Sequence, residues 1–238
     1  MKAMVLAAGR GTRLKPFTDN MPKPMIPVAG RPILEHIVIQ LRDVGFTDLV
    51  INLHYHPEAI TEHFGNGDKF GVRIHYSRET ALLGTAGAVK KIQDQFIGPF
   101  LVYYGDNYVE IDLDQFVRAH HDAAPVATIA VFPCDNPSMS GIARVDDGQN
   151  IVEFVEKPVP GSNAGNLANA GVYILNPGVL KAIPADRPSD FGHDIFPELL
   201  RQGQNLKAFM LSGRVIGVDT PELHTRLERY LSGRKRHA

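Results

Sequence analysis

This chain has little cysteine, no tryptophan, no long apolar run and no excess of either charge. Cys134 is the only cysteine among 238 residues, which excludes an intrachain disulfide and, with no leader-like start, leads us to expect a cytoplasmic protein. Lysine and arginine number 25 against 26 acidic residues, so the charge balance gives no reason to expect a nucleic-acid partner. No apolar run approaches the ~18 residues that span a membrane, so we expect no membrane partner either.

Short apolar, β-branched runs alternate with amphipathic segments in the first half of the chain. This alternation predicts an α/β fold with a Rossmann-like, doubly wound and mostly parallel sheet. We expect a single domain over residues 1–238, with one half at about 1–132 and the other at about 133–238. The predicted strands span 3–7, 48–53, 72–76, 100–104, 127–132, 141–145, 151–156, 170–175, 207–210 and 215–218, and the predicted helices span 32–44, 57–64, 85–95, 113–122, 191–201 and 221–231.

The loop after the first predicted strand starts with almost no side chains and then becomes basic. Its small residues include Ala7, Ala8, Gly9 and Gly11, and the two of its basic residues that matter here are Arg13 and Lys23. The dinucleotide fingerprint G-x-G-x-x-G fails because Leu14 stands at its third glycine, and the G-K-[ST] ending of a P-loop is absent. Small residues instead let backbone groups approach a flat base and a phosphate chain, to which the two cations supply charge.

In this loop the chain resembles the sugar-1-phosphate nucleotidylyltransferases, or NDP-sugar pyrophosphorylases. The segment LAAGRGTRL at residues 6–14, continued by PKP at 22–24, matches their signature. Further matches follow in the family's order: Glu79 with LGTA at 83–86, GDN at 105–107, EKP at 156–158, NAG at 169–171 and DTPE at 219–222. The chain is similar to the short form without a C-terminal β-helix, as in mannose-1-phosphate guanylyltransferase catalytic domains.

The resemblance implies Mg²⁺-dependent transfer of a nucleotidyl group from a nucleoside triphosphate to a sugar 1-phosphate, with release of pyrophosphate. The attacking phosphate has a second pKa of about 6 and needs no strong base. The implied catalytic residues are Arg13, on the triphosphate, Lys23, on a phosphate, and Asp106. Asp106 and Asp219 are the implied Mg²⁺ ligands. Many relatives read D-x-G-T-P where this chain reads GVDTP at 217–221, so whether Asp219 reaches the metal stays open.

The resemblance also implies two sets of binding residues. The nucleotide set lies in the first half of the chain, and the sugar-phosphate set lies in the second half apart from Asn107. The nucleotide set is Leu6, Ala7, Ala8, Gly9, Gly11, Thr12, Arg13, Glu79 and Gly84. The sugar-phosphate set is Asn107, Gly141, Glu156, Lys157, Asn169 and Gly171.

Glu79 favours GTP as the nucleotide. A carboxylate only accepts hydrogen bonds, and guanine offers two adjacent N–H groups on one edge. We therefore favour GTP with mannose or heptose 1-phosphate. UTP, dTTP or CTP with glucose, MurNAc or GlcNAc 1-phosphate are the alternatives, because uracil and thymine also present one ring N–H and the GDN segment at 105–107 is reminiscent of thymidylyltransferases.

Two hypotheses of other classes stay open. A nicotinamide-dependent oxidoreductase would need the glycine that Leu14 replaces, and Arg13 argues against it. A catalytically silent, nucleotide-sensing regulatory subunit is favoured only by the altered order around Asp219. Since no β-helix follows the predicted catalytic fold, an oligomer, such as a homodimer, would have to be built from that fold itself.

Overall fold

The computed structural model describes residues 1–234, with all side chains except those of Arg13 and Arg234. These residues form two compact units. The first unit comprises residues 2–82, 104–110 and the chain from residue 214 on, and the second comprises residues 83–103 and 111–213 with Met1. The single domain expected above stays a prediction.

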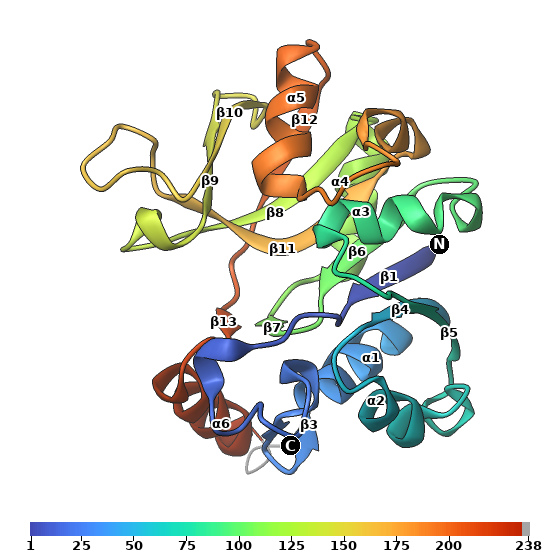
Figure 1. The fold of residues 1–238 in the computed structure, drawn as a ribbon. Helices are drawn as coiled ribbons and strands as arrows, with labels where there is room; N and C mark the ends of the chain where they lie inside the picture. Colours follow the sequence, from blue (N-terminus) through green and yellow to red (C-terminus); the bar gives the residue numbers. More distant parts are fainter. Residues whose placement is uncertain (235–238) are drawn as a thin grey trace. The chain divides into compact units, whose positions relative to one another are not determined.

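Three parallel strands form the sheet of the first unit: β1 (Lys2–Leu6), β4 (Asp48–Leu53) and β5 (Arg73–Arg78). They pair in the order β1-β4-β5 (Figure 1), so that Leu6, Asn52 and Ser77 lie at one level of the sheet. Residues 3–5 of β1 are 0% exposed, as continuous apolar runs predict for a sheet that is covered on both faces. All three strands end at the same edge, where ligands of parallel sheets bind.

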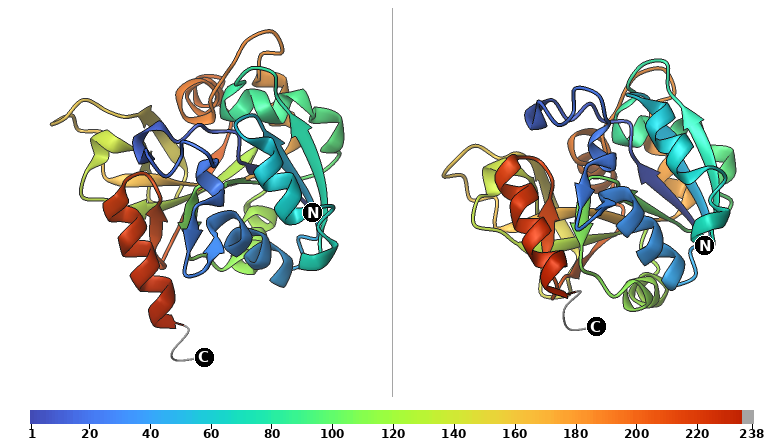
Figure 2. Two further views of the ribbon diagram at one scale, coloured as in Figure 1. Left: turned by 60° about the horizontal axis from the view of Figure 1, so that its bottom comes forward. Right: turned by 90° about the horizontal axis from the view of Figure 1, so that it is seen from below.

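Helices and short elements complete the first unit: α1 (Ile33–Asp43), α2 (Pro57–Phe64), α6 (Pro221–Arg234), β2 (Pro27–Val28), β3 (Arg31–Pro32), β7 (Asn107–Val109) and β13 (Val215–Gly217). The buried side of α1 carries Ile33, Ile37 and Leu41, which recur every four residues and so share one face. α6, red in Figure 2, is hydrogen-bonded to the segment after β2. The Ala29 N–H donates to Glu228 Oε2 of this helix at 2.6 Å.

The second unit contains a mixed sheet: β6 (Phe100–Tyr104), β8 (Ala127–Pro133), β9 (Gly141–Val145), β10 (Ile151–Glu156), β11 (Leu167–Leu175) and β12 (Leu206–Met210). β11 pairs antiparallel with β6, β8 and β9, whereas β12 pairs parallel with β8. Its α-helices are α3 (Gly84–Lys91), α4 (Leu113–Ala123) and α5 (Phe196–Arg201). The predicted α/β class is confirmed. Among the described strands, antiparallel pairs also occur in the first unit, where β2 pairs with β3 and β7 with β13.

Most predicted elements occur within four residues of their predicted ends. The predicted helix at 191–201 is divided into a π-helical turn, Phe191–Ile195, and α5. Pro197 lies in the first turn of α5 and lacks the N–H that a continuous α-helix would need there. β7 was not predicted, because its three residues pair only with β13, which is distant in the sequence.

Within the described residues, none of the helices combines the length and the apolar character needed to cross a membrane.

Candidate functional site

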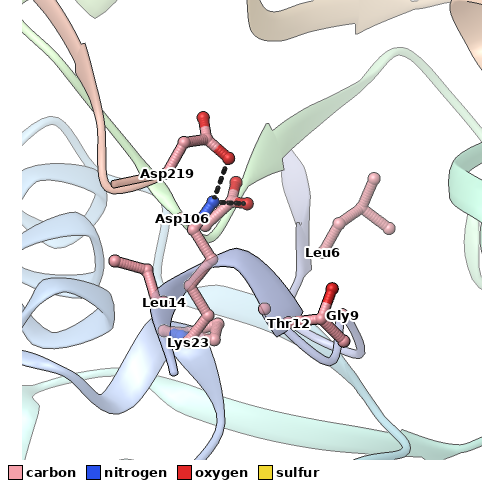
Figure 3. A pocket seen from close by; sticks show the side chains of 9 residues that line it. Leu6, Gly9, Thr12, Leu14, Lys23, Asp106 and Asp219 are labelled. Carbon is pink, nitrogen blue, oxygen red and sulfur yellow. Dashed lines mark hydrogen bonds and ion pairs between the residues drawn. The ribbon is translucent and has the colours of Figure 1, made fainter. Parts of the chain in front are cut away.

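A cavity of about 180 Å³ lies in the first unit at the carboxyl end of β1. Its walls come from the loop after β1, the segment that carries Lys23, and the residues beside β7 and β13. The lining residues are Leu6, Gly9, Gly11, Thr12, Leu14, Lys23, Pro24, Asp106 and Asp219 (Figure 3). Most of the loop residues that the sequence assigns to the nucleotide therefore line one cavity. Both aspartates that it assigns to the metal line the same cavity.

The glycines of the loop have different physical roles. Gly11 has a φ of 62°, and a Cβ there would lie 2.8 Å from the Lys23 Cβ, so only glycine lets the loop fold this closely on the lysine. Thr18 Oγ1 donates to the Gly11 carbonyl oxygen at 2.9 Å and holds this turn. At Gly9 no atom lies within 4 Å of the position of a Cβ, so the backbone there is open to the cavity.

Gly105 places Asp106 beside the end of β1. Its N–H donates to the Leu6 carbonyl oxygen at 2.9 Å. A Cβ at this position would lie 2.8 Å from the same oxygen, so a larger residue would force the two backbone segments apart. The close approach directs the next residue, Asp106, into the cavity.

The position of Asp219 follows from the pairing of β13 with β7. Gly217 stands opposite Asn107 in this antiparallel pair, and the Val218 N–H donates to the Asp106 carbonyl oxygen at 3.1 Å. Residue 219 is therefore held next to residue 106. The sequence left open whether Asp219, in the order GVDTP, reaches the metal site. In the structure its side chain lies beside that of Asp106.

Lys23 lies between these two carboxylates (Figure 3). Its Nζ is 2.7 Å from Asp106 Oδ2 and 2.9 Å from Asp219 Oδ1. Lys23 is only 5% exposed, and burial by itself would lower its pKa, but the charges and hydrogen bonds of Asp106 and Asp219 outweigh burial and raise the pKa above its usual range. The lysine is therefore an ammonium ion at neutral pH, and one negative charge of the pair is not compensated.

The two carboxylates suit a hard divalent cation. Their side chains are 33% and 37% exposed, and Mg²⁺ is commonly held by one or two carboxylates together with waters and phosphate oxygens. Among the described residues, no group of three or more histidine, cysteine, aspartate or glutamate side chains is arranged so that it could hold a metal ion. Any metal at Asp106 and Asp219 would therefore take its other ligands from water or substrate.

Glu79 follows β5 and is 7% exposed. Its Oε1 accepts a hydrogen bond from Asn52 Nδ2 at 2.7 Å, and Asn52 Oδ1 accepts one from the Ala7 N–H at 2.7 Å. Asn52 is not among the residues expected from the sequence. The signal that could have found it is one amide inside the apolar run LVINL at residues 49–53, since a buried amide needs hydrogen-bond partners.

The predicted sugar-phosphate residues, apart from Asn107, lie in the second unit. Glu156, the last residue of β10, stands opposite Gly141, the first residue of β9. A Cβ at Gly141 would lie 2.6 Å from Glu156 Oε2, so this glycine makes room for the carboxylate. Burial, together with the charge of Asp190, raises the pKa of Glu156 although Lys157 acts in the opposite direction.

Asn169 and Gly171 lie at an irregularity of β11. Asn169 Oδ1 accepts from the Gly171 N–H at 2.8 Å, and its Nδ2 donates to Tyr173 Oη at 2.6 Å. Pairing of β11 with β8 is interrupted between residues 169 and 173, which is the kind of bulge that redirects side chains next to binding sites. Gly84, which the sequence assigns to the nucleotide, also lies in this unit. Its φ of 75° is a backbone conformation that favours glycine.

Arg13 belongs to a short 3₁₀ turn, Thr12–Leu14. Its side chain lies outside the described part of the chain, so its assignment to the triphosphate stays a prediction.

Comparison with known proteins gives one family over most of the chain. The family described as Nucleotidyl transferase matches residues 2–217. A UTP--glucose-1-phosphate uridylyltransferase of Synechocystis is 38% identical over 217 residues, covering 85% of this chain and 56% of that protein. A mannose-1-phosphate guanyltransferase of Emericella nidulans is 36% identical over 228 residues, covering 93% of this chain and 62% of that protein. The chain thus spans less than two thirds of the length of either relative.

Solved structures support the fold. A Bacillus anthracis structure in complex with a sucrose, described as a candidate glucose-1-phosphate thymidylyltransferase, has a TM-score of 0.89 at 26% identity, covering 98% of this chain and 95% of that one. HddC from Yersinia pseudotuberculosis, complexed with GMP-PN, has a TM-score of 0.81 at 26% identity, covering 97% and 99%. The chain therefore has the nucleotide-diphospho-sugar transferase fold.

Proposed function

Because this chain belongs to the nucleotidyl transferase family, we propose that it transfers a nucleotidyl group from a nucleoside triphosphate to a sugar 1-phosphate, giving an NDP-sugar and pyrophosphate. One observation carries the proposal. Lys23, Asp106 and Asp219 meet in a cavity whose remaining wall is the small-residue loop after β1.

This site suits a reaction between two anions. A phosphate oxygen of the sugar 1-phosphate attacks the α-phosphorus, and the bond from that phosphorus to the β-phosphate oxygen breaks. The attacking oxygen is ionised near neutral pH, so the protein has to position the two substrates and stabilise charge. Lys23 uses two of its three N–H donors on the aspartates, and the third can donate to a phosphate. Arg13 would stabilise the departing pyrophosphate.

Asp106 and Asp219 would hold the Mg²⁺ that this family's chemistry implies. When bound, the ion would supply positive charge for phosphate oxygens that the protein does not neutralise. The two aspartates themselves orient Lys23, because its ammonium group lies between them.

The sugar phosphate would be bound through the predicted residues described above. Lys157 would supply a charge for the phosphate, while Glu156 and Asn169 would bind sugar hydroxyl groups. Gly141 and Gly171 would give access to backbone, and Asn107 would act beside Asp106.

For the base we propose GTP, with mannose or heptose 1-phosphate as the acceptor. Glu79 offers acceptors, the Emericella relative is named for guanyl transfer to mannose 1-phosphate, and HddC was solved with GMP-PN. The second candidate is a UTP-, dTTP- or CTP-dependent enzyme for glucose, MurNAc or GlcNAc 1-phosphate. The names of the Synechocystis relative and the Bacillus structure favour its first two nucleotides.

We further propose a cytoplasmic protein with no nucleic-acid partner, on the grounds of its single cysteine and balanced charge. A homodimer built from this fold is the proposed oligomer.

Pyrophosphate release tests the proposed reaction. Four nucleoside triphosphates would be combined with mannose, glucose, GlcNAc, MurNAc and heptose 1-phosphates in the presence of Mg²⁺. We expect turnover that requires a sugar 1-phosphate and is abolished in Asp106→Ala. Nucleotide binding without turnover in any combination would instead support the regulatory-subunit hypothesis.

A further inference from the structure

The segment HYH at residues 54–56, directly after β4, contacts the loop after β1, and we infer that its Tyr55 is a positioning residue for that loop. The inference rests on the proposed function, in which the loop binds the nucleoside triphosphate. Tyr55 Oη donates to the Thr18 carbonyl oxygen at 2.9 Å and to that of Asp19 at 3.1 Å. His56 Nε2 is 3.3 Å from the same Asp19 oxygen. Because carbonyl oxygens only accept, both side chains act here as donors.

A second hydrogen bond continues from Thr18 to the 3₁₀ turn that carries Arg13. Thr18 is 1% exposed, and its Oγ1 donates to the Gly11 carbonyl oxygen at 2.9 Å. The same oxygen accepts from the Leu14 N–H at 3.0 Å, which is the hydrogen bond that closes the turn. The Tyr55 hydroxyl is thus two hydrogen bonds away from the backbone of the turn.

The loop has few buried side chains of its own. Among the described side chains of residues 12–20, those of Leu14 and Thr18 are buried and the others are exposed. A segment with so little buried surface opens locally at a low cost in free energy. The hydrogen bonds from Tyr55 and His56 therefore contribute a large part of what keeps the loop in one conformation.

The segment that carries Tyr55 is itself firmly attached. It follows β4, which pairs in parallel with β1 on one side and β5 on the other. His54 Nδ1 donates to the Glu79 carbonyl oxygen at 3.0 Å, and α2 begins directly after His56. Tyr55 is therefore supported by regular elements on both sides, which is the condition for a side chain to hold a binding loop in place.

The variant Tyr55→Phe removes the hydroxyl and keeps the ring. We expect trypsin to cleave after Arg10 or Arg13 about fivefold faster, because the loss of a hydrogen bond increases the open population of the loop. The value of kcat/KM should fall about tenfold, since small displacements of reacting groups slow a reaction steeply. The matched control is Tyr76→Phe in the same unit. It removes a hydroxyl that donates to the Gly65 carbonyl oxygen at 2.7 Å, and both measurements should stay within about twofold of the wild type.

A double variant separates positioning of the turn from general support of the fold. In the Arg13→Ala background, Tyr55→Phe should lower kcat/KM by less than about threefold, because the side chain that the turn positions is already absent. A residue that only supports the fold would cause the same tenfold loss in both backgrounds.

Thermal unfolding of each variant checks that it folds. If Tyr55→Phe does not fold, Thr18→Val replaces it, because it removes the next hydrogen bond toward the turn and keeps a branched side chain. A Tyr55→Phe variant with the wild-type cleavage rate and kcat/KM, or with equal losses in both backgrounds, would overturn the inference. Faster cleavage in Tyr55→Phe but not in Tyr76→Phe, in a protein that releases no pyrophosphate, would refute the proposed reaction and leave the inference standing.

Discussion

Asp219 and Asp106 accept hydrogen bonds from one ammonium group, at 2.9 Å and 2.7 Å. Two carboxylates this close repel each other unless a cation lies between them, and Lys23 supplies only one positive charge. The two carboxylates can therefore bind a further cation, and the site would not become strongly positive.

Asp219→Asn should lower Mg²⁺-dependent pyrophosphate release by about 100-fold or more and raise the Mg²⁺ concentration at half-maximal rate. The reason is that the amide keeps the shape but not the charge on which binding of a hard cation depends. Titration of the rate with Mg²⁺ measures both effects. Asp43→Asn, at an exposed residue of α1, is the control, and an unaltered Mg²⁺ dependence would remove Asp219 from the metal site.

Gly105→Ala should lower the free energy of unfolding by about 1–3 kcal/mol, the usual cost of overpacking. The added methyl group would lie 2.8 Å from the Leu6 carbonyl oxygen, and backbone moves less readily than a flexible side chain. Urea unfolding gives the difference. Gly98→Ala is the matched control because no atom lies within 4 Å of its Cβ position. Equal stability of the two variants would contradict the close approach at Gly105.

Glu156→Gln should become more stable relative to the wild type as the pH rises from below 4.5. Burial raises the pKa of Glu156 above its ordinary value of 4.5, so the folded protein holds this proton more tightly than the unfolded chain. Wild-type stability therefore falls as the pH rises from 4.5 to the raised pKa, and the glutamine variant lacks this loss.

Urea unfolding at a series of pH values tests the Glu156 prediction. The difference between variant and wild type should level off above the raised pKa. Glu153→Gln, at a residue of the same strand whose side chain is 46% exposed, should show no such trend. A difference that does not change with pH would show that Glu156 ionises as readily in the folded protein as in the unfolded chain.

Arg13→Ala should lower kcat far more than it raises KM, because the charge that it is proposed to stabilise develops in the transition state. A loss of about 100-fold or more in kcat is expected for a charged group of this kind. Steady-state kinetics of pyrophosphate release measures both constants, with Arg31→Ala, an exposed arginine of the same unit, as the control. Equal changes in kcat and KM would show that Arg13 only anchors the triphosphate.

Local patterns predicted most of the elements. The strands at 48–53 and 100–104 and the helix at 57–64 have the predicted bounds, because their apolar periodicity and flanking polar residues are local properties. The strand β7 could not be found in this way, since it consists of three residues that pair with the distant β13.

The site was predictable to the extent that it follows a continuous motif. The loop at residues 6–14 and the lysine at 23 could be assigned from the sequence, and the cavity contains both. Asn52 could not, because its hydrogen-bond partners Ala7 and Glu79 follow the two neighbouring strands and are far from it in the sequence.

The sequence by itself determined the family resemblance, the α/β class and the identity of the charged groups, because motifs and periodicity are written along the chain. Only the tertiary structure decided which of these groups meet. The pairing of β13 with β7 brings Asp219 to Asp106 and Lys23, and the parallel register of β1, β4 and β5 places Asn52 between Ala7 and Glu79. Both arrangements come from backbone hydrogen bonds between distant segments, which no local pattern specifies.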